Sequence, residues 1–159
     1  MLPDRSSITC SRRIEFDAAH RVMRHESKCR HLHGHRYRVD ITATALDDLD
    51  DIGRVIDFSV LKSIVGGWID EQWDHGAILN DQDEALIEYC LDNNSKCFLL
   101  PNSENPTAEV MAAYLLEISN RLLADAGSPV LITHIRLYET PNCWADVHVD
   151  SVAAVAWRA

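Results

Sequence analysis

The feature that most constrains this chain is a histidine-rich segment, Cys29-Arg30-His31-Leu32-His33-Gly34-His35, together with the alternation that follows it. From His35 to Ala43 every second residue carries a ring or an apolar side chain. A period of two is typical of a half-buried β-strand. The sequence therefore predicts a strand from Arg36 to Leu46, and an extended backbone at its start places His33 and His35 on the same side.

Two imidazoles on one side of a strand suggest a metal site, although a His-x-His pair alone is more often a surface feature than a ligand set. Two further residues favour a metal here. His20 ends another alternating stretch, and Cys29 lies four residues before His33 without being needed to complete the coordination. Three imidazoles, from His20, His33 and His35, would leave the fourth position of a tetrahedral ion open. An open position is typical of catalytic zinc, whereas structural zinc is closed by four protein ligands.

The composition indicates an ordinary globular protein. The chain has 159 residues, of which 47% are hydrophobic, so we expect a single domain, 1–159, with a sizeable core. It contains no apolar run of about 18 residues and no recognisable signal peptide at its start. Its five cysteines are odd in number and form no CxxC pair, which argues against a disulfide framework and favours a reducing cytoplasm.

The charge distribution is uneven. A net charge of −10 argues against general nucleic-acid binding. Between residues 21 and 38, however, six cations are opposed only by Glu26. This basic segment predicts either a small polyanionic ligand or pairing with acidic neighbours at a subunit interface. Its cations are Arg21, Arg24, Lys28, Arg30, Arg36 and Arg38.

Two amphipathic helices are predicted in the middle of the chain. The first runs from Phe58 to about Trp73 with Asp57 as its N-cap. Gly66-Gly67 lies inside it, where each glycine costs about 1 kcal/mol relative to alanine, and this indicates close packing against a sheet. The second helix begins at Asn105-Pro106-Thr107, with Asn105 or Thr107 as its cap, and runs to Asp125.

The remaining segments complete an α+β pattern. We expect a first strand from Ser6 to His20, a third from Val130 to Thr140 and a fourth from Cys143 to about Val149. The stretch from Asp81 to Glu104 has a weak pattern and predicts an elaborated connection with one short strand or helix. Apart from that connection the order is β-β-α-α-β-β.

One acidic residue stands out on the third predicted strand. Glu139 shares a face with Leu131, Ile135 and Leu137. A carboxylate beside an apolar face is costly unless it has a partner. Glu139 would therefore either reach solvent at the strand end or, if buried, accept from a ligand with two adjacent N–H donors.

These pieces together resemble the 6-pyruvoyl-tetrahydropterin synthase / 6-carboxytetrahydropterin synthase family over most of the chain, from about Ile14 to Val149. The resemblance implies a tunnelling fold (T-fold): a four-stranded antiparallel sheet with two helices on one face, assembled into an oligomeric barrel, commonly a hexamer. The motifs that carry the resemblance are Phe16-Asp17-Ala18-Ala19-His20, Cys29-x-x-x-His33-Gly34-His35, Val55-Ile56-Asp57-Phe58, Asp74-His75, Asn105-Pro106-Thr107-Ala108-Glu109 and Glu139-Thr140.

The resemblance also implies roles for individual residues. His20, His33 and His35 would be the zinc ligands. Cys29 would be the catalytic thiol, acting with Asp74 and His75 of a neighbouring subunit. Glu139 would anchor the pterin ring, with Thr107 nearby in the pocket.

The implied reaction is that of a zinc-dependent lyase without nucleic-acid or membrane partners. It would convert 7,8-dihydroneopterin triphosphate to 6-carboxy-5,6,7,8-tetrahydropterin, with loss of triphosphate and acetaldehyde, in queuosine and 7-deazapurine biosynthesis. A cysteine at position 29, where one branch of the family has a glutamate, disfavours a hydroxymethyl-pterin product. The alternatives are a 6-pyruvoyl product, a catalytically silent pterin- or purine-binding module, and a zinc-storage or metal-sensing protein.

Overall fold

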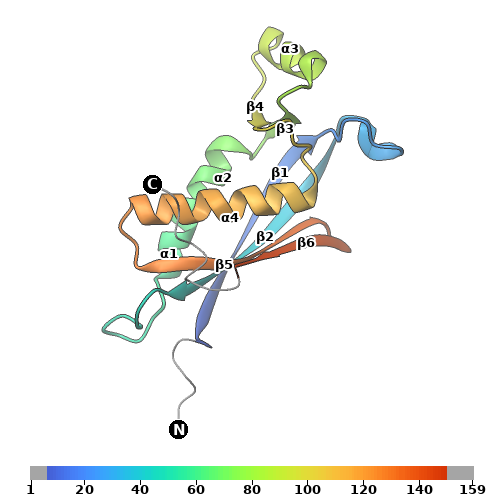
Figure 1. The fold of residues 1–159 in the computed structure, drawn as a ribbon. Coiled ribbons are helices and arrows are strands. Elements are labelled where there is room, and N and C mark those ends of the chain that lie inside the picture. Colours follow the sequence, from blue (N-terminus) through green and yellow to red (C-terminus); the bar gives the residue numbers. More distant parts are fainter. Residues whose placement is uncertain (1–6, 150–159) are drawn as a thin grey trace.

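A computed structural model describes residues 7–149 of the chain (Figure 1). Their strands form one six-stranded sheet in the order β4-β3-β1-β2-β5-β6. The strands are β1 (Thr9–His20), β2 (His33–Ala45), β3 (Gly76–Asn80), β4 (Cys97–Leu100), β5 (Val130–Thr140) and β6 (Cys143–His148). The helices are α1 (Phe58–Leu61), α2 (Gly67–Gln72), α3 (Glu84–Asp92) and α4 (Ala108–Asp125). A π-helical segment, Lys62–Gly66, joins α1 to α2, and a 3-10 turn, Lys28–Arg30, lies between β1 and β2.

The sheet differs from the four-stranded antiparallel sheet expected from the sequence. The four expected strands are present, and β1, β2, β5 and β6 pair in that order, all antiparallel. Two short strands extend the sheet beyond β1: β3 pairs parallel to β1, and β4 pairs parallel to β3. A parallel pair needs a crossover connection, and α3 supplies one between β3 and β4. The sheet is therefore mixed.

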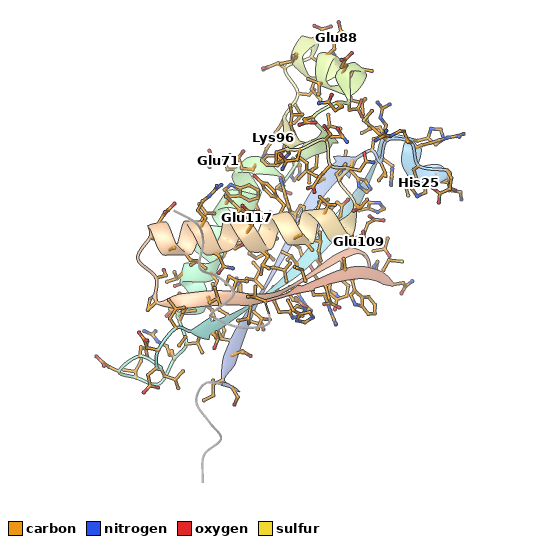
Figure 2. All side chains as sticks on the ribbon, in the orientation of Figure 1. His25, Glu71, Glu88, Lys96, Glu109 and Glu117 are labelled. Carbon is orange, nitrogen blue, oxygen red and sulfur yellow. The ribbon has the colours of Figure 1, made fainter. Side chains whose placement is uncertain are left out.

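The segment 81–104 also contains more than the single short element expected. Both α3 and β4 lie in it, and α3 projects beyond the end of the main sheet (Figure 1). The Asp83 carboxylate caps α3 by accepting from the Leu86 N–H at 3.3 Å. The helix α3 buries only Cys90 and leaves Tyr89 and Leu91 exposed, and its Glu88 points away from the sheet (Figure 2), so it contributes little to the core.

The core lies between the sheet and the helices α1, α2 and α4, which cover one face of it (Figure 1). The first predicted helix is present as α1, the π-helical segment and α2, and Asp57 caps it by accepting from the Ser59 N–H. The expected close approach holds at Gly66, where an added Cβ would lie 3.1 Å from Ile14 Cδ1. It does not hold at Gly67, where an added Cβ would meet no atom of the described residues within 4 Å. Thr107, rather than Asn105, caps α4.

Strand boundaries and registers shift slightly from those expected. The first strand begins at Thr9, whereas the expected start, Ser6, lies outside the described residues. The strand β2 begins at His33 because His33 already pairs with His20. The expected face of β5 is wrong at one residue. A register shift pairs Ile132 with the core-facing Ala43, so Ile132, and not Leu131, shares a face with Ile135. Within the part of the chain that the structure describes, no helix is long and apolar enough to cross a membrane.

Candidate functional site

The structure brings His20, His33 and His35 together on the helix-covered face of the sheet. His20 ends β1 opposite His33, and His35 lies opposite Ala18, so the β1–β2 register places the three side chains side by side. Their metal-ligating nitrogens all lie within 4.8 Å of one another. The Nε2 atoms of His20 and His33 are 3.1 Å apart. This triad can present three nitrogens to one ion.

Backbone carbonyls orient two of the three rings. The Nδ1 of His20 lies 2.7 Å from the Pro106 carbonyl oxygen, and the Nδ1 of His33 lies 2.7 Å from the His31 carbonyl oxygen. A ring that donates from Nδ1 keeps its Nε2 lone pair for a metal, an arrangement common among metal-ligating histidines. The Nε2 of His35 is buried without a hydrogen-bond partner among the described residues. These features fit a zinc ion.

Burial keeps the rings of His20 and His35 neutral. It lowers the pKa of His20, whose residue is 1% exposed, and of His35. Neutral imidazole is the form that binds a metal. Tyr37 packs against both rings, with ring centroids 6.0 Å from His20 and 5.6 Å from His35. Burial raises the pKa of Tyr37 strongly, so its hydroxyl stays protonated beside the triad.

Glu139 lies next to the triad. Its two carboxylate oxygens are 3.9 Å from His20 Nε2 and 3.6 Å from His35 Nε2, and its side chain is 22% exposed. Both possibilities drawn from the sequence are thus met in part, because the carboxylate is half-buried and still accessible. It can accept hydrogen bonds from a ligand bound beside the metal.

Cys29 lies in the 3-10 turn that leads into β2 and is partly buried. It is not a member of the metal-ligating group formed by the three histidines. Its carbonyl accepts from the Val22 N–H at 2.9 Å. The same loop is held at Met23, whose N–H donates to Asn105 Oδ1 at 3.0 Å and whose carbonyl accepts from Asn105 Nδ2 at 2.9 Å. The start of α4 therefore positions both the Cys29 loop and the His20 ring.

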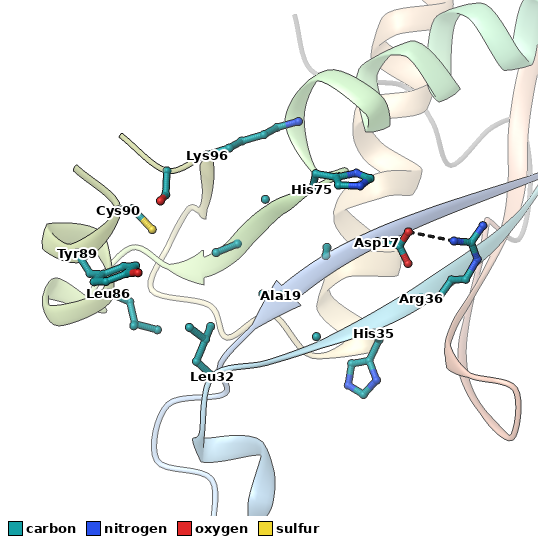
Figure 3. Close-up of a pocket in the computed structure, with 15 residues that line it drawn as sticks. Asp17, Ala19, Leu32, His35, Arg36, His75, Leu86, Tyr89, Cys90 and Lys96 are labelled. Carbon is teal, nitrogen blue, oxygen red and sulfur yellow. Dashed lines mark hydrogen bonds and ion pairs between the residues drawn. The ribbon is translucent and has the colours of Figure 1, made fainter. Parts of the chain in front are cut away.

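Asp74 and His75 lie together but apart from the triad. His75 Nδ1 is 2.7 Å from Asp74 Oδ2, and Asp74 Oδ1 accepts from the Asp17 N–H at 2.8 Å. His75 also donates its own N–H to the Asp17 carbonyl at 2.7 Å. Both contacts are with the backbone of Asp17, so they place the pair along the edge of β1, where β3 begins. Figure 3 shows His75 and His35 on different sides of the β1–β2 ribbon.

The Asp74–His75 dyad is held by these hydrogen bonds, and its histidine faces solvent. Burial raises the pKa of Asp74, but the Asp17 N–H and the His75 ring outweigh it and bring the pKa below its ordinary value. The His75 side chain is 77% exposed. It borders a cavity of about 710 Å³ between β1, β2 and the β3–α3–β4 segment (Figure 3). His35 lines the same cavity, but within one chain Asp74 and His75 do not belong to the metal-ligating group of the triad.

Comparison with known proteins identifies the family. A family model described as 6-pyruvoyl tetrahydropterin synthase matches residues 9–150. The chain belongs to this family. It is 44% identical over 144 residues to the 6-carboxy-5,6,7,8-tetrahydropterin synthase of Rickettsia felis, covering 88% of this chain and 99% of the relative.

Solved structures show the same fold as this family member. An uncharacterized protein from Wolinella succinogenes matches with a TM-score of 0.73 at 23% identity, covering 89% of this chain and 97% of the other. The 6-pyruvoyl tetrahydropterin synthase of Caenorhabditis elegans matches with a TM-score of 0.62 at 21% identity, covering 89% and 95%. The α+β T-fold expected from the resemblance is confirmed, with the two additional parallel strands described above.

The basic segment of this family member divides into two groups. Arg21 forms a paired contact with the buried carboxylate of Asp83, and Arg36 lies 3.0 Å from Asp17. Arg38 stacks over the Tyr138 ring at 3.8 Å. The other three cations contact no carboxylate among residues 7–149. They are Arg24, Lys28 and Arg30.

Several contacts of the site were not predicted from the sequence. The Asn105-Pro106 dipeptide is visible as a helix start, but nothing local indicates that its carbonyl and amide hold His20 and Met23. Lys96 donates to the carbonyls of Asp70 and Asp74, at 2.8 and 2.7 Å. It belongs to none of the sequence motifs described above. Both contacts join residues distant in sequence, which a single sequence does not pair.

Proposed function

We propose that this chain is a zinc-dependent 6-carboxytetrahydropterin synthase. It converts 7,8-dihydroneopterin triphosphate to 6-carboxy-5,6,7,8-tetrahydropterin, with loss of triphosphate and acetaldehyde, in the cytoplasmic pathway to queuosine and other 7-deazapurines. The observation that carries the proposal is the triad of imidazoles beside Glu139. The likeness to the Rickettsia felis relative supports the choice of product.

The triad is the proposed zinc site. When bound there, zinc would acidify the side-chain hydroxyls of the substrate and stabilise negative charge on its oxygens. The protein's own part is to hold the three nitrogens in place. The carbonyls of Pro106 and His31 do this for His20 and His33.

Glu139 is the proposed anchor for the pterin ring. The adjacent ring N–H and amino group of a pterin form a donor pair, and a carboxylate accepts two such donors in parallel. Its position next to the triad supports this role, because an anchored ring would carry its side chain toward the metal. Thr107 already accepts from the Val110 N–H through its hydroxyl oxygen at 3.3 Å, so its hydroxyl proton is free to donate to the ligand.

Cys29 is the proposed base that removes protons from the substrate side chain. It would act with the Asp74–His75 dyad of a neighbouring subunit. Asp74 accepts from His75 Nδ1 and so leaves Nε2 to exchange a proton with solvent or substrate. The exposed ring of His75, which is not part of its own chain's metal-ligating group, supports a site completed between subunits of a homohexamer. Residues 1–159 would form one domain in each subunit.

The triphosphate would be bound by Arg24, Lys28 and Arg30. Two of these cations flank Cys29 directly, and none of the three is paired with a carboxylate in the described part of the chain. A polyanion bound there would place the leaving group beside the proposed base. The other cations of the basic segment are already engaged within the chain.

Product analysis tests the proposal. Zinc-loaded protein is incubated with 7,8-dihydroneopterin triphosphate, and the products are identified by mass spectrometry, with Cys29→Ala as the matched inactive variant. We expect 6-carboxytetrahydropterin and acetaldehyde in equal amounts from the wild type. A 6-pyruvoyl product would assign the chain to the other synthase branch. Unchanged substrate, from a folded chain with zinc bound, would favour a silent binding module.

A further inference from the structure

A second group of metal-ligating side chains lies on the other face of the sheet. It comprises His134 of β5 with Asp146 and His148 of β6, and their ligand atoms all lie within 4.8 Å of one another. His134 pairs directly opposite His148. The neighbouring pair, Ile135 and Val147, projects to the opposite side, toward the core. The group therefore sits on the face that α1, α2 and α4 leave uncovered (Figure 1).

The three side chains are already in contact. The two imidazole rings stack with their centroids 4.1 Å apart and their planes 6° from parallel. His134 Nε2 lies 2.7 Å from Asp146 Oδ1. Cross-strand partners on one face of an antiparallel pair are close enough for their side chains to share a ligand.

We propose that His134, Asp146 and His148 form a second, solvent-facing site for a divalent transition-metal ion such as Zn²⁺. Two imidazole nitrogens and one carboxylate oxygen are a ligand set that suits zinc and its neighbours Ni²⁺ and Cu²⁺. Calcium and magnesium prefer sites made of oxygen atoms and would not be selected. Water would complete the coordination, because the group is only partly buried.

Arg136 determines how strongly this group binds an ion. Its Nε and Nη2 lie 2.7 and 2.9 Å from the two oxygens of Asp146. The guanidinium, together with His134, holds the pKa of Asp146 far below its usual range, so the carboxylate is ionised. The same positive charge repels a cation. The outer group is therefore a weaker site than the His20 triad, whose neighbouring carboxylate, Glu139, pairs with no lysine or arginine among the described residues.

This second site is independent of the proposed enzyme activity, but it changes what the number of metal ions bound per chain indicates. A catalytic protein with a single zinc site predicts one ion per chain, and a storage protein predicts several. With the outer group present, a catalytic chain would bind a second ion at higher zinc concentration. Total metal content alone then fails to separate the two functions, whereas the metal content of variants separates them.

The test is a calorimetric titration of Zn²⁺ into the full chain carrying His33→Ala, which disables the inner triad. The same titration is repeated with His148→Ala or Asp146→Asn added. His25→Ala is the matched control, because His25 is a partly exposed histidine outside both groups. Circular dichroism checks that each variant is folded.

We expect one ion to bind to the His33→Ala chain and the affinity to fall about tenfold or more when His148 or Asp146 is also changed. Loss of a single supporting contact already costs a metal site that much, and loss of a ligand costs at least as much. The His25→Ala control should bind as its parent does. No binding by folded His33→Ala protein would overturn the proposal, as would equal binding with and without His148. Either result would leave the catalytic proposal untouched.

Discussion

The two histidine groups of this protein use similar ligands in different surroundings. His20 of the inner triad is buried and His33 and His35 are partly buried. Glu139 lies beside them, and backbone carbonyls fix two of the three rings. The outer group on β5 and β6 is partly exposed and has Arg136 against its carboxylate. The comparison teaches that the residue types alone do not decide which group is catalytic. Burial and the contacts behind the ligands support the inner group as the proposed catalytic site.

The largest effect is expected from breaking the inner triad. His33→Ala removes one of three ligands, so the chain should lose its tightly bound zinc. Turnover of 7,8-dihydroneopterin triphosphate should fall by about a thousandfold or more, because a bound metal contributes several kcal/mol to such a reaction. Metal analysis and steady-state kinetics measure both. His148→Ala, on the outer face, should leave turnover unchanged; a similar loss in that variant would reverse the assignment of the two groups.

The next effect separates the proposed base from the metal. Cys29→Ala should keep zinc and fold but lower kcat by about a hundredfold to ten-thousandfold, the usual contribution of a positioned acid or base. Cys143→Ala, a change at an exposed thiol, is the control. Unchanged kcat in Cys29→Ala would remove this thiol from the mechanism, and loss of zinc would instead make it a ligand.

A mixing experiment tests whether the site lies between subunits. His75→Ala and Cys29→Ala chains should each be nearly inactive alone. In oligomers reassembled from both, each site that takes Cys29 from one chain and His75 from the other is intact, so about a quarter of the sites should recover. Activity is measured after mild dissociation and reassembly. An absence of recovery in verified mixed oligomers would place both residues in the same chain's site.

The smallest effect is expected on the outer face. In metal-free protein, Asp146→Asn should lower the free energy of unfolding by about 1 kcal/mol or less, because exposed ion pairs contribute little. The folded pKa of Asp146 is lowered, so this contribution is present above the ordinary aspartate pKa of about 3.9 and is lost as the pH falls below it. Urea titrations at decreasing pH should show wild type and variant converging. A gap that widens at low pH would contradict this account.

The inner triad could be predicted because strand periodicity places residues on faces without any knowledge of distant contacts. His20, His33 and His35 lie at the alternate positions that face the core, on two strands that follow each other in the chain. The outer group has a similar signal in the sequence. His134 and His148 are equally distant from the Pro141 turn, so a simple hairpin register would already have paired them.

Other parts of the molecule could not be predicted because their stabilising contacts are not local. The β3–α3–β4 segment depends on parallel pairing to β1 and on the contact of Arg21 with Asp83, 62 residues later. Its nine-residue helix buries only Cys90, so it has little of the buried face by which the longest helix is recognised. The register shift at Ile132 likewise arises from pairing with β2, and no residue of β5 indicates it in the sequence.

The most direct test of the central claim is to locate the first zinc ion that the protein binds. Crystals of protein loaded with one equivalent of zinc would be measured on both sides of the zinc absorption edge, and the anomalous difference map would show the ion's position. The account predicts one peak among His20, His33 and His35, within coordination distance of their nitrogens. A first peak at His134 and His148, with none at the inner triad, would contradict it.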